Sequence, residues 1–418
     1  MAARTGGADL KFISIVVCPL LLVGLAQAGV NAQTGDPVSA ARLRLGPVGI
    51  TPGVTVSAGT DSNVFAEETN PKSDFVTIVS PHVQMWLRAR RLILDVESHT
   101  DAVNFSQYDA QGGINTRNEV RLELPLNRVR LSVANSFASL QQRVSPDIDA
   151  RARRHTNTFT AGADIHATAK SYVRVAALRS HTEFDDNALN LGVRLAETLN
   201  RQMFGGTAAW RYQVTGATTI TVSADAIREE FEFSTDRDST SLRIAPGVEF
   251  DPRAIISGRA YVGYRRFDIT SGLAQPFSGP VAAAELSSTI RETTRLSVQI
   301  NRDVAYSYDV ATPYYVLDGG GAAIGQRLGE RWEVRAQASR QRLGYRGAAL
   351  LVLDPDAEPV APVADRKDYF YSYGAGVNYL FNANVRFGVN VDRSVRESGL
   401  VQRGYEGTRI VAQFGYGP

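Results

Sequence analysis

The chain has 418 residues, 44% of them hydrophobic, and a formal net charge of +2 at pH 7. The small net charge argues against a strongly basic nucleic-acid surface, so no nucleic-acid partner is expected. After residue 30, no stretch of the sequence reaches the length of apolar run that a transmembrane helix needs. Strands that alternate apolar and polar residues would escape such a search, because each needs only half of its residues to be apolar.

The first segment has the pattern of a secretory signal. Arg4 and Lys11 supply positive charge, an apolar run extends from Phe12 to Leu25, and Ala26-Gln27-Ala28 offers a cleavage site between small residues. We therefore predict a cleaved signal peptide at 1–28, a short periplasmic leader at 29–49 and a single domain at 50–418. The one cysteine, Cys18, lies inside the signal, so the mature chain would have no disulfide and no thiolate chemistry.

A period of two residues dominates the rest of the sequence. In the segment Arg91–Phe105, Leu92 and Leu94 share one face, whereas Asp95 and Glu97 share the other. This pattern predicts β-strands with one apolar and one polar face.

The joints between these strand segments alternate between tight turns and longer polar loops. In chain order, the predicted strands are Ile50–Thr60, Asp74–Arg88, Arg91–Phe105, Ile114–Leu124, Arg128–Gln142, Arg154–Thr168, Ser171–Phe184, Asn200–Val214, Thr218–Glu232, Arg237–Phe250, Ala254–Ile269, Gly279–Ile290, Thr294–Tyr308, Pro313–Gln326, Arg331–Gly344, Asp368–Leu380, Asn384–Val395 and Tyr405–Tyr416. One predicted loop is Arg143–Arg153, and the longest, from about Tyr345 to Lys367, carries three prolines.

These patterns predict an all-β fold, a closed antiparallel up-and-down transmembrane β-barrel of about 18 strands, with 16 as the alternative. An even count places both termini on the periplasmic side, the short turns there and the long loops outside. Closure is expected because a strand in lipid cannot leave its backbone donors unpaired. Many segments are longer than the bilayer requires, so the wall is expected to project beyond it.

Motifs spread along the mature chain resemble the putative β-barrel porin 2 family of Gram-negative outer-membrane proteins, which includes members associated with exopolysaccharide biosynthesis. They are Asp61-Ser62-Asn63-Val64-Phe65, the segment Tyr261–Phe267, Phe277-Ser278-Gly279-Pro280, Arg295-Leu296-Ser297-Val298, Arg366-Lys367-Asp368-Tyr369, Asp392-Arg393-Ser394 and Gly404–Arg409. The resemblance implies an outer-membrane barrel and hints at polysaccharide export. It supplies no catalytic residues.

We find no sequence motif for catalysis or for a cofactor. Gly-x-Ser-x-Gly, His-Glu-x-x-His and the phosphate-binding loop are missing, and the five histidines have no zinc spacing. We therefore expect no enzyme activity, no cofactor and no metal. An enzyme assembled from separate strands, such as His155 with a Ser or Asn on a neighbouring strand, is the less favoured alternative.

Charged residues on the polar faces are the candidates for lining a pore. They are Asp95, Glu97, Asp101, Arg117, Glu119, Arg121, Glu123, Arg128, Arg130, Arg259, Arg295 and Arg335. The simpler interpretation of any one of them is a lumen charge that pairs across strands; the functional one is a lining that sets ion or sugar selectivity. Aromatic residues such as Trp86, Trp210 and Trp332 are expected to form the girdle at the membrane interface, with sugar stacking as the alternative.

The sequence thus predicts a channel or porin-like protein of the outer membrane that passes, or helps to export, polysaccharide or small polar solutes. A structural or adhesive barrel without an open pore is the alternative, and an enzyme acting on lipid or polysaccharide is a third. Expected partners are outer-membrane lipid and lipopolysaccharide, the outer-membrane assembly machinery and, in an export role, polysaccharide export components.

Overall fold

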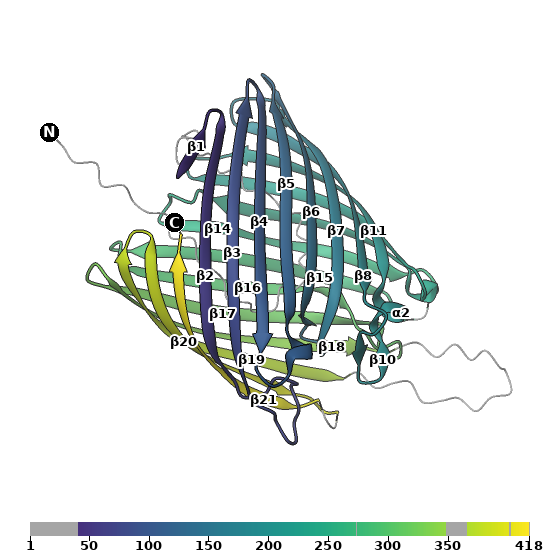
Figure 1. Ribbon diagram of the computed structural model, residues 1–418. Coiled ribbons are helices and arrows are strands. Elements are labelled where there is room, and N and C mark those ends of the chain that lie inside the picture. Colours follow the sequence, from purple (N-terminus) through teal and green to yellow (C-terminus); the bar gives the residue numbers. More distant parts are fainter. Residues whose placement is uncertain (1–40, 273, 348–365, 401–402, 418) are drawn as a thin grey trace.

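The computed structural model describes residues 41–272, 274–347, 366–400 and 403–417, and these form a closed antiparallel barrel (Figure 1). The predicted signal peptide and most of the Tyr345–Lys367 loop lie outside the described residues. Eighteen strands make the wall, and the last pairs with the first, from Val54↔Tyr416 to Asp61↔Arg409. The predicted fold class and the predicted count of 18 are therefore confirmed.

Each wall strand pairs with the strands before and after it in the chain. The strands are β2 (Val48–Asp61), β3 (Asp74–Ala89), β4 (Leu92–Phe105), β5 (Gly113–Pro125), β6 (Val129–Ser145), β7 (Ile148–His166), β8 (Ser171–Phe184), β11 (Arg201–Gln213), β12 (Thr218–Phe231), β13 (Ser239–Phe250), β14 (Ile256–Ile269), β15 (Phe277–Ile290), β16 (Thr294–Tyr306), β17 (Tyr314–Leu328), β18 (Trp332–Arg346), β19 (Lys367–Asn382), β20 (Val385–Glu397) and β21 (Tyr405–Tyr416).

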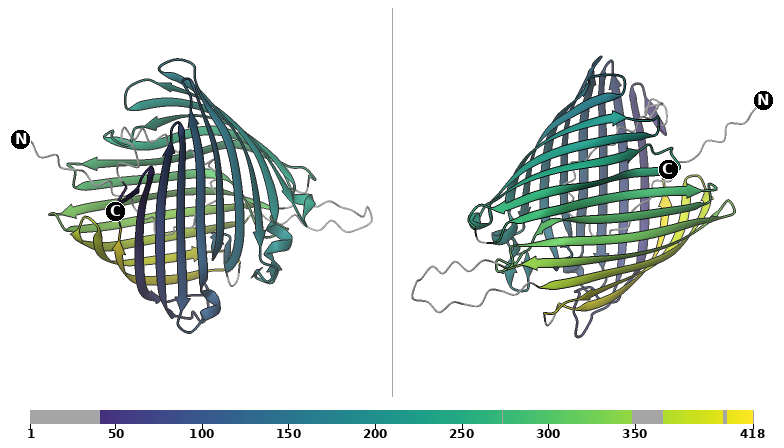
Figure 2. Two further views of the ribbon diagram at one scale, coloured as in Figure 1. Left: turned by 45° about the horizontal axis from the view of Figure 1, so that its top comes forward. Right: turned by 180° about the vertical axis from the view of Figure 1, so that it is seen from behind.

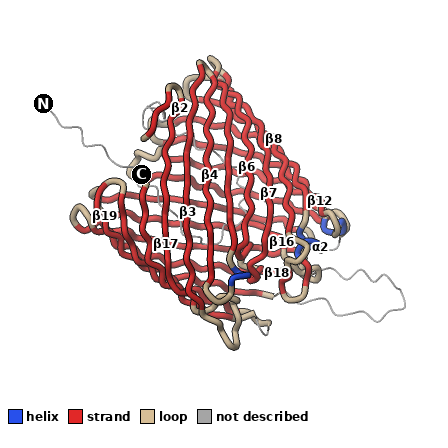
Figure 3. Tube along the Cα trace, in the orientation of Figure 1, coloured by secondary structure: helices blue, strands red, loops and turns tan. Residues whose placement is uncertain are grey.

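Small elements occupy some of the joints. Strand β1 (Leu43–Leu45), within the predicted leader, pairs with the start of β2. The joint after β8 holds β9 (Leu189–Asn190), β10 (Val193–Arg194) and the short helix α2 (Leu195–Leu199), and η1 (Asp109–Gln111) and η2 (Thr235–Arg237) are single 3-10 turns. Figure 3 shows how little of the described chain is helical. Among the described residues, no helix is long and apolar enough to cross a membrane.

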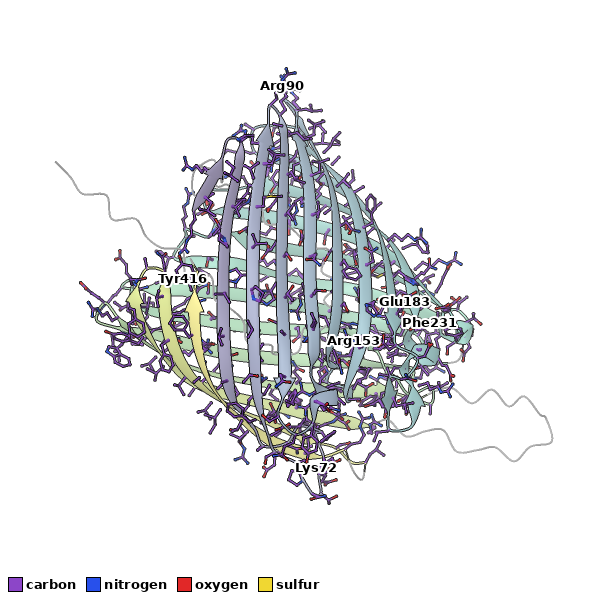
Figure 4. All side chains as sticks on the ribbon, viewed as in Figure 1. Lys72, Arg90, Arg153, Glu183, Phe231 and Tyr416 are labelled. Carbon is purple, nitrogen blue, oxygen red and sulfur yellow. The ribbon has the colours of Figure 1, made fainter. Side chains whose placement is uncertain are left out.

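The two ends of the barrel differ as the alternation of joints predicts. Arg90, in the turn after β3, lies at the opposite end of the wall from Lys72, in the loop after β2 (Figure 4). We call the end of the wall that holds Arg90 the turn end, and the end that holds Lys72 the loop end. Figure 2 shows the strongly tilted strands from two further sides, with the C-terminus at the turn end.

One predicted loop is wrong. The segment Arg143–Arg153 is not a loop, because β6 continues to Ser145 and β7 begins at Ile148, with only Pro146 and Asp147 between them. The register shifts between Arg143 and Ser145, so the hairpin is irregular where it leaves the wall. Charged residues at Arg143, Asp149, Arg151 and Arg153 hid the strand from a search for apolar alternation.

Candidate functional site: a charged lumen and a crossed mouth

The polar face of the wall is the concave face. The Arg335 guanidinium on β18 reaches Asn390 Oδ1 on β20 at 2.6 Å, passing over Gly376 on the strand between them. A contact between two strands that are not neighbours requires the sheet to curve toward the face that carries both side chains. The other face carries exposed Val120, Leu131 and Val298, as a lipid-facing surface should.

Strands β4 and β5 form an acidic wall of the lumen. Asp95 lies opposite Arg121, and Glu97 lies directly opposite Glu119, a pairing of like charges that is unfavourable in a sheet. Arg121 approaches Glu119 at 2.5 Å. Glu123 shares this face by register.

Nearer the loop end of the same wall, the charges are held by neighbours. Asp101 accepts a hydrogen bond from Ser80 at 2.6 Å and lies 2.9 Å from His99 and 3.8 Å from Arg117. This carboxylate is therefore better compensated than Glu97 or Glu119.

The far side of the lumen is richer in arginine. Arg259 lies 3.5 Å from Glu285, and Arg295 donates to Ser287 at 3.4 Å. Arg335 contacts Asn390, as described above. Because β16 lies almost opposite β4 in the sheet order, acidic and basic walls face each other across the interior.

Two predicted candidates and one aromatic lie at the turn end. Arg130 has the inward register of Asp164, its partner on β7, whereas Arg128 is exposed in the turn between β5 and β6. Trp86 is paired with Asp95, so it shares the polar face and is not part of an outer girdle, unlike Trp210 and Trp332. The girdle interpretation of Trp86 is wrong because the alternation of β3 puts even-numbered residues inside.

At the loop end, the hairpin β6–β7 crosses the mouth of the barrel. Its tip residue Asp147 is fully buried and contacts Tyr345 on β18, although seven strands separate β6 from β18 one way around the barrel and nine the other. The opposite hairpin, β16–β17, also leans inward, because Tyr306 and Tyr314 pack against the inner residues Phe267 and Phe277. The two hairpins meet inside the mouth.

Asp147 is the hub of this meeting. Its carboxylate accepts hydrogen bonds from Ser307 Oγ and from the Tyr308 backbone N–H, both at 3.0 Å, and from the Tyr345 hydroxyl. Arg403, in the loop after β20, approaches the carboxylate at 3.3 Å and donates to the Asp147 carbonyl at 2.5 Å. Burial raises the pKa of the Tyr308 hydroxyl, so this neighbour is a neutral phenol at physiological pH.

A second buried ion cluster lies beside the hub. Arg396 binds Asp368 and Asp149, each at 2.7 Å, and Arg366 lies 3.3 Å from Asp368. Asp149 belongs to β7, so this cluster ties the crossing hairpin to β19 and β20 on the far wall. We call Asp147, Asp149, Asp368, Arg396 and Arg403 the mouth cluster.

Arg237 fixes the other side of the mouth. This fully buried side chain donates to the carbonyl of Thr198 at 2.8 Å, to that of Pro313 at 3.0 Å and to that of Ser307. Burial lowers the pKa of Arg237 to about 10, so the guanidinium remains charged at neutral pH. It joins the end of α2 to both ends of the β16–β17 loop.

Sequence reasoning missed the mouth cluster and Arg237. They lie near the ends of the predicted strands, and their partners are distant in the chain, from 28 positions between Arg396 and Asp368 to 256 between Asp147 and Arg403. Pro146-Asp147 is a usual turn pair and could have indicated a tight turn inside the predicted loop.

A cavity of about 960 Å³ opens beside the crossing hairpin. Its lining comes from the loop after β2, from β7 and from the β8–β11 joint, and it includes Glu67, Lys72, Arg151 and Asn190. The mixed charges make it a polar vestibule at the loop end.

His155 and the serine opposite it are not arranged as a Ser-His-Asp triad. Ser139 lies opposite His155 in the sheet, and His155 Nε2 lies 3.4 Å from Asp185 Oδ1. In a Ser-His-Asp triad that nitrogen would face the serine. No hydrogen bond joins Ser139 to His155 in the described part of the chain. Among the same residues, no group of three or more His, Cys, Asp and Glu could hold a metal ion.

The model of the family described as "Putative beta-barrel porin 2" matches residues 36–415 of the chain. The chain belongs to this family. The family and the barrel fold together indicate that this porin-family chain is an outer-membrane protein. No curated relative matches the sequence.

This porin-family member is similar to several solved structures at low sequence identity. A BenF-like porin from Pseudomonas fluorescens Pf-5 is 10% identical, with a TM-score of 0.49 over 88% of this chain and 99% of the porin. OpdQ from Pseudomonas aeruginosa is 8% identical, with a TM-score of 0.46 over 88% and 98%. The FrpB iron transporter from Neisseria meningitidis is 11% identical, with a TM-score of 0.44 over 83% and 62%.

Proposed function

We propose that the protein is a passive, selective channel for small polar solutes across the outer membrane, with its loop end outside. The observation that carries the proposal is the charged concave face, acidic on β4–β5 and basic on the far side, within a wall whose other face is apolar. A lumen of this kind conducts polar solutes and sorts them by charge and size. No chemical step is part of the proposal.

The crossing hairpin sets the size limit in this proposal. A solute has to pass beside β6–β7, which the mouth cluster holds against the far wall. Glu97 and Glu119 then act on the solute further down, where the two carboxylates face each other in register. Charged side chains that line a narrow passage give a pore its ion selectivity.

Polysaccharide export is the second candidate, and it rests on the family resemblance. An extended sugar chain could pass only if the hairpins β6–β7 and β16–β17 separated, which would break the hydrogen bonds of Asp147 with Ser307 and Tyr308. An inner-membrane machine and export partners would have to supply the drive. We therefore rank export below diffusion of small solutes.

Solute entry into proteoliposomes tests the proposal. Purified protein is reconstituted, and swelling rates are measured with glucose, maltose, maltotriose and longer maltodextrins. The proposal predicts entry of the smallest sugar and a steep fall in rate with each added unit. Entry rates equal to those of protein-free liposomes for every solute would contradict it and would favour a structural or adhesive barrel.

A further inference from the structure

The outer face of the wall carries an arginine row near the loop end. Arg302 on β16, Asp318 on β17 and Arg342 on β18 are paired in register across three neighbouring strands. Asp318 accepts hydrogen bonds from both guanidinium groups, including Arg342 Nε at 3.0 Å. Arg302 lies on the same face of β16 as exposed Ile300, and Asp318 lies on the same face of β17 as exposed Ile324, so the row faces outward.

A third arginine lies in the next row toward the turn end. Arg340 is exposed and stacks over the rings of Tyr369 and Tyr371, with its guanidinium 4.9 and 5.7 Å from their centroids. It makes no ion pair with any residue in the described parts of the chain. The three guanidinium groups thus have one carboxylate among them, that of Asp318, which pairs with Arg302 and Arg342 only.

Glycine leaves the space between these side chains open. Gly320 is the register partner of Arg340 and of Ile300, so it lies within the patch. A Cβ placed on it would meet nothing nearer than the Gln299 carbonyl at 3.9 Å. An anion could therefore approach the backbone between Arg302, Arg340 and Arg342, which we call the arginine patch.

The patch borders directly on the apolar band. Ile300, Val298 and Ile324 are exposed on the same face, at the patch and one or two rows nearer the turn end. Tyr373, also exposed, lies beside them on β19. Aromatic residues and basic residues at the limit of the apolar band mark the level of lipid headgroups.

The opposite arc of the wall differs. By register, every outward position of β2 to β5 carries an uncharged residue, among them Ser98, Asn118 and Thr116. The arginines of the patch thus have no counterpart on the outer face of β2 to β5.

We propose that the arginine patch is a binding site for the phosphate of an anionic lipid headgroup in the outer leaflet. Arginine binds phosphate through two parallel N–H donors, and Arg340 has its donors uncommitted to any carboxylate. The headgroup would lie over Gly320, and its acyl chains would follow Ile300 and Ile324 along the wall. Asp318 holds Arg302 and Arg342 in place on either side of it through its two carboxylate oxygens.

Binding of a diphosphorylated lipid A to the purified full chain tests the site. The protein in detergent is titrated with this lipid, and bound lipid is counted by native mass spectrometry. Replacing the patch in the variant R302Q/R340Q/R342Q is expected to weaken binding by at least about tenfold, since charge-assisted hydrogen bonds are lost. Lipid A without its phosphates is expected to bind wild type and variant alike, and weakly.

The matched control is Arg266→Gln on β14, an exposed outward arginine that pairs with Asp268 at 2.7 Å. It should leave lipid binding unchanged, and resistance of both variants to SDS without heating shows that their barrels are folded. Equal affinity of wild type and the triple variant would overturn the proposal. So would an equal loss in Arg266→Gln, because binding would then follow total charge, and so would full competition by millimolar inorganic phosphate, because the site would then serve the free ion.

Discussion

Asp147 at the tip of the β6–β7 hairpin accepts a hydrogen bond from the hydroxyl of Tyr345 on the far wall of the barrel. Both side chains are fully buried, so the contact excludes water and closes the span of the hairpin across the mouth. A buried carboxylate with a phenol, a serine, a backbone N–H and an arginine around it is well compensated. The hairpin is therefore a fixed part of the passage.

Replacing Asp147 by Ala should release the hairpin tip. Arg403 would be left buried with one carboxylate fewer, and breaking a buried pair costs about 3–5 kcal/mol. We expect a larger and noisier single-channel conductance, and entry of longer maltodextrins into liposomes. Asp268→Ala, on the outer face, is the control. Unchanged conductance and size limit in Asp147→Ala would show that the hairpin does not restrict the passage.

Replacing Glu97 and Glu119 by Gln should change the selectivity of the channel and leave its fold intact. The two carboxylates face each other in register, so relief of their repulsion should offset the loss of the Glu119–Arg121 ion pair, each effect being about 0.2–1 kcal/mol. The reversal potential in a salt gradient is expected to shift toward anion preference. Glu230→Gln, on the outer face beside Arg228, should give no shift. A shift of the same size in both variants would show that the acidic wall does not set the ion selectivity.

Arg237→Ala should loosen the loop between β16 and β17. The carbonyl groups of Thr198, Ser307 and Pro313 lose the Arg237 donor. The Pro313 carbonyl keeps the Ser307 N–H at 3.1 Å, and each buried group left unsatisfied costs about 1–3 kcal/mol. Hydrogen exchange measured by mass spectrometry should become faster in residues 307–313 and remain unchanged in the middle of the wall strands. Arg228→Ala is the control, since that arginine is exposed on β12. Protection that survives in Arg237→Ala would mean that other contacts hold the loop.

Gly59→Val should weaken the closing seam. A Cβ at Gly59 would lie 2.0 Å from the carbonyl oxygen of Ile410 on β21, so the first and last strands would have to move apart. Overpacking of this kind costs about 1–3 kcal/mol, and the temperature at which SDS unfolds the barrel should fall. Gly216→Val, in a turn with open space around it, should leave that temperature unchanged. Equal behaviour of the two variants would show that the seam tolerates a side chain.

The wall could be predicted from the sequence because one rule governs it everywhere. Alternation places Leu94 outside and Asp95 inside, and each tight turn reverses the direction of the chain. Strand number, closure and the inward face of most charged candidates follow from that rule alone. Trp86 is the exception. An aromatic residue of its kind is expected at the lipid interface, but its position in the alternation of β3 places it on the polar face.

The mouth could not be predicted because no local rule governs it. Asp147 and Tyr345 lie 198 positions apart in the chain, and Asp147 and Arg403 lie 256 apart. In β7, Asp149 and Arg151 replace the apolar residues that the alternation needs, since this part of the strand leaves the wall and pairs with Arg396 on β20 and Asp61 on β2. Only the three-dimensional arrangement shows that such residues meet.

Single-channel recording of the purified protein in planar lipid bilayers shows whether the barrel conducts. We predict discrete conductance steps for the wild-type chain, and larger, less stable steps for Asp147→Ala in the same salt. An absence of steps in both proteins, with each shown to be folded and inserted, would contradict the claim that this barrel is a channel.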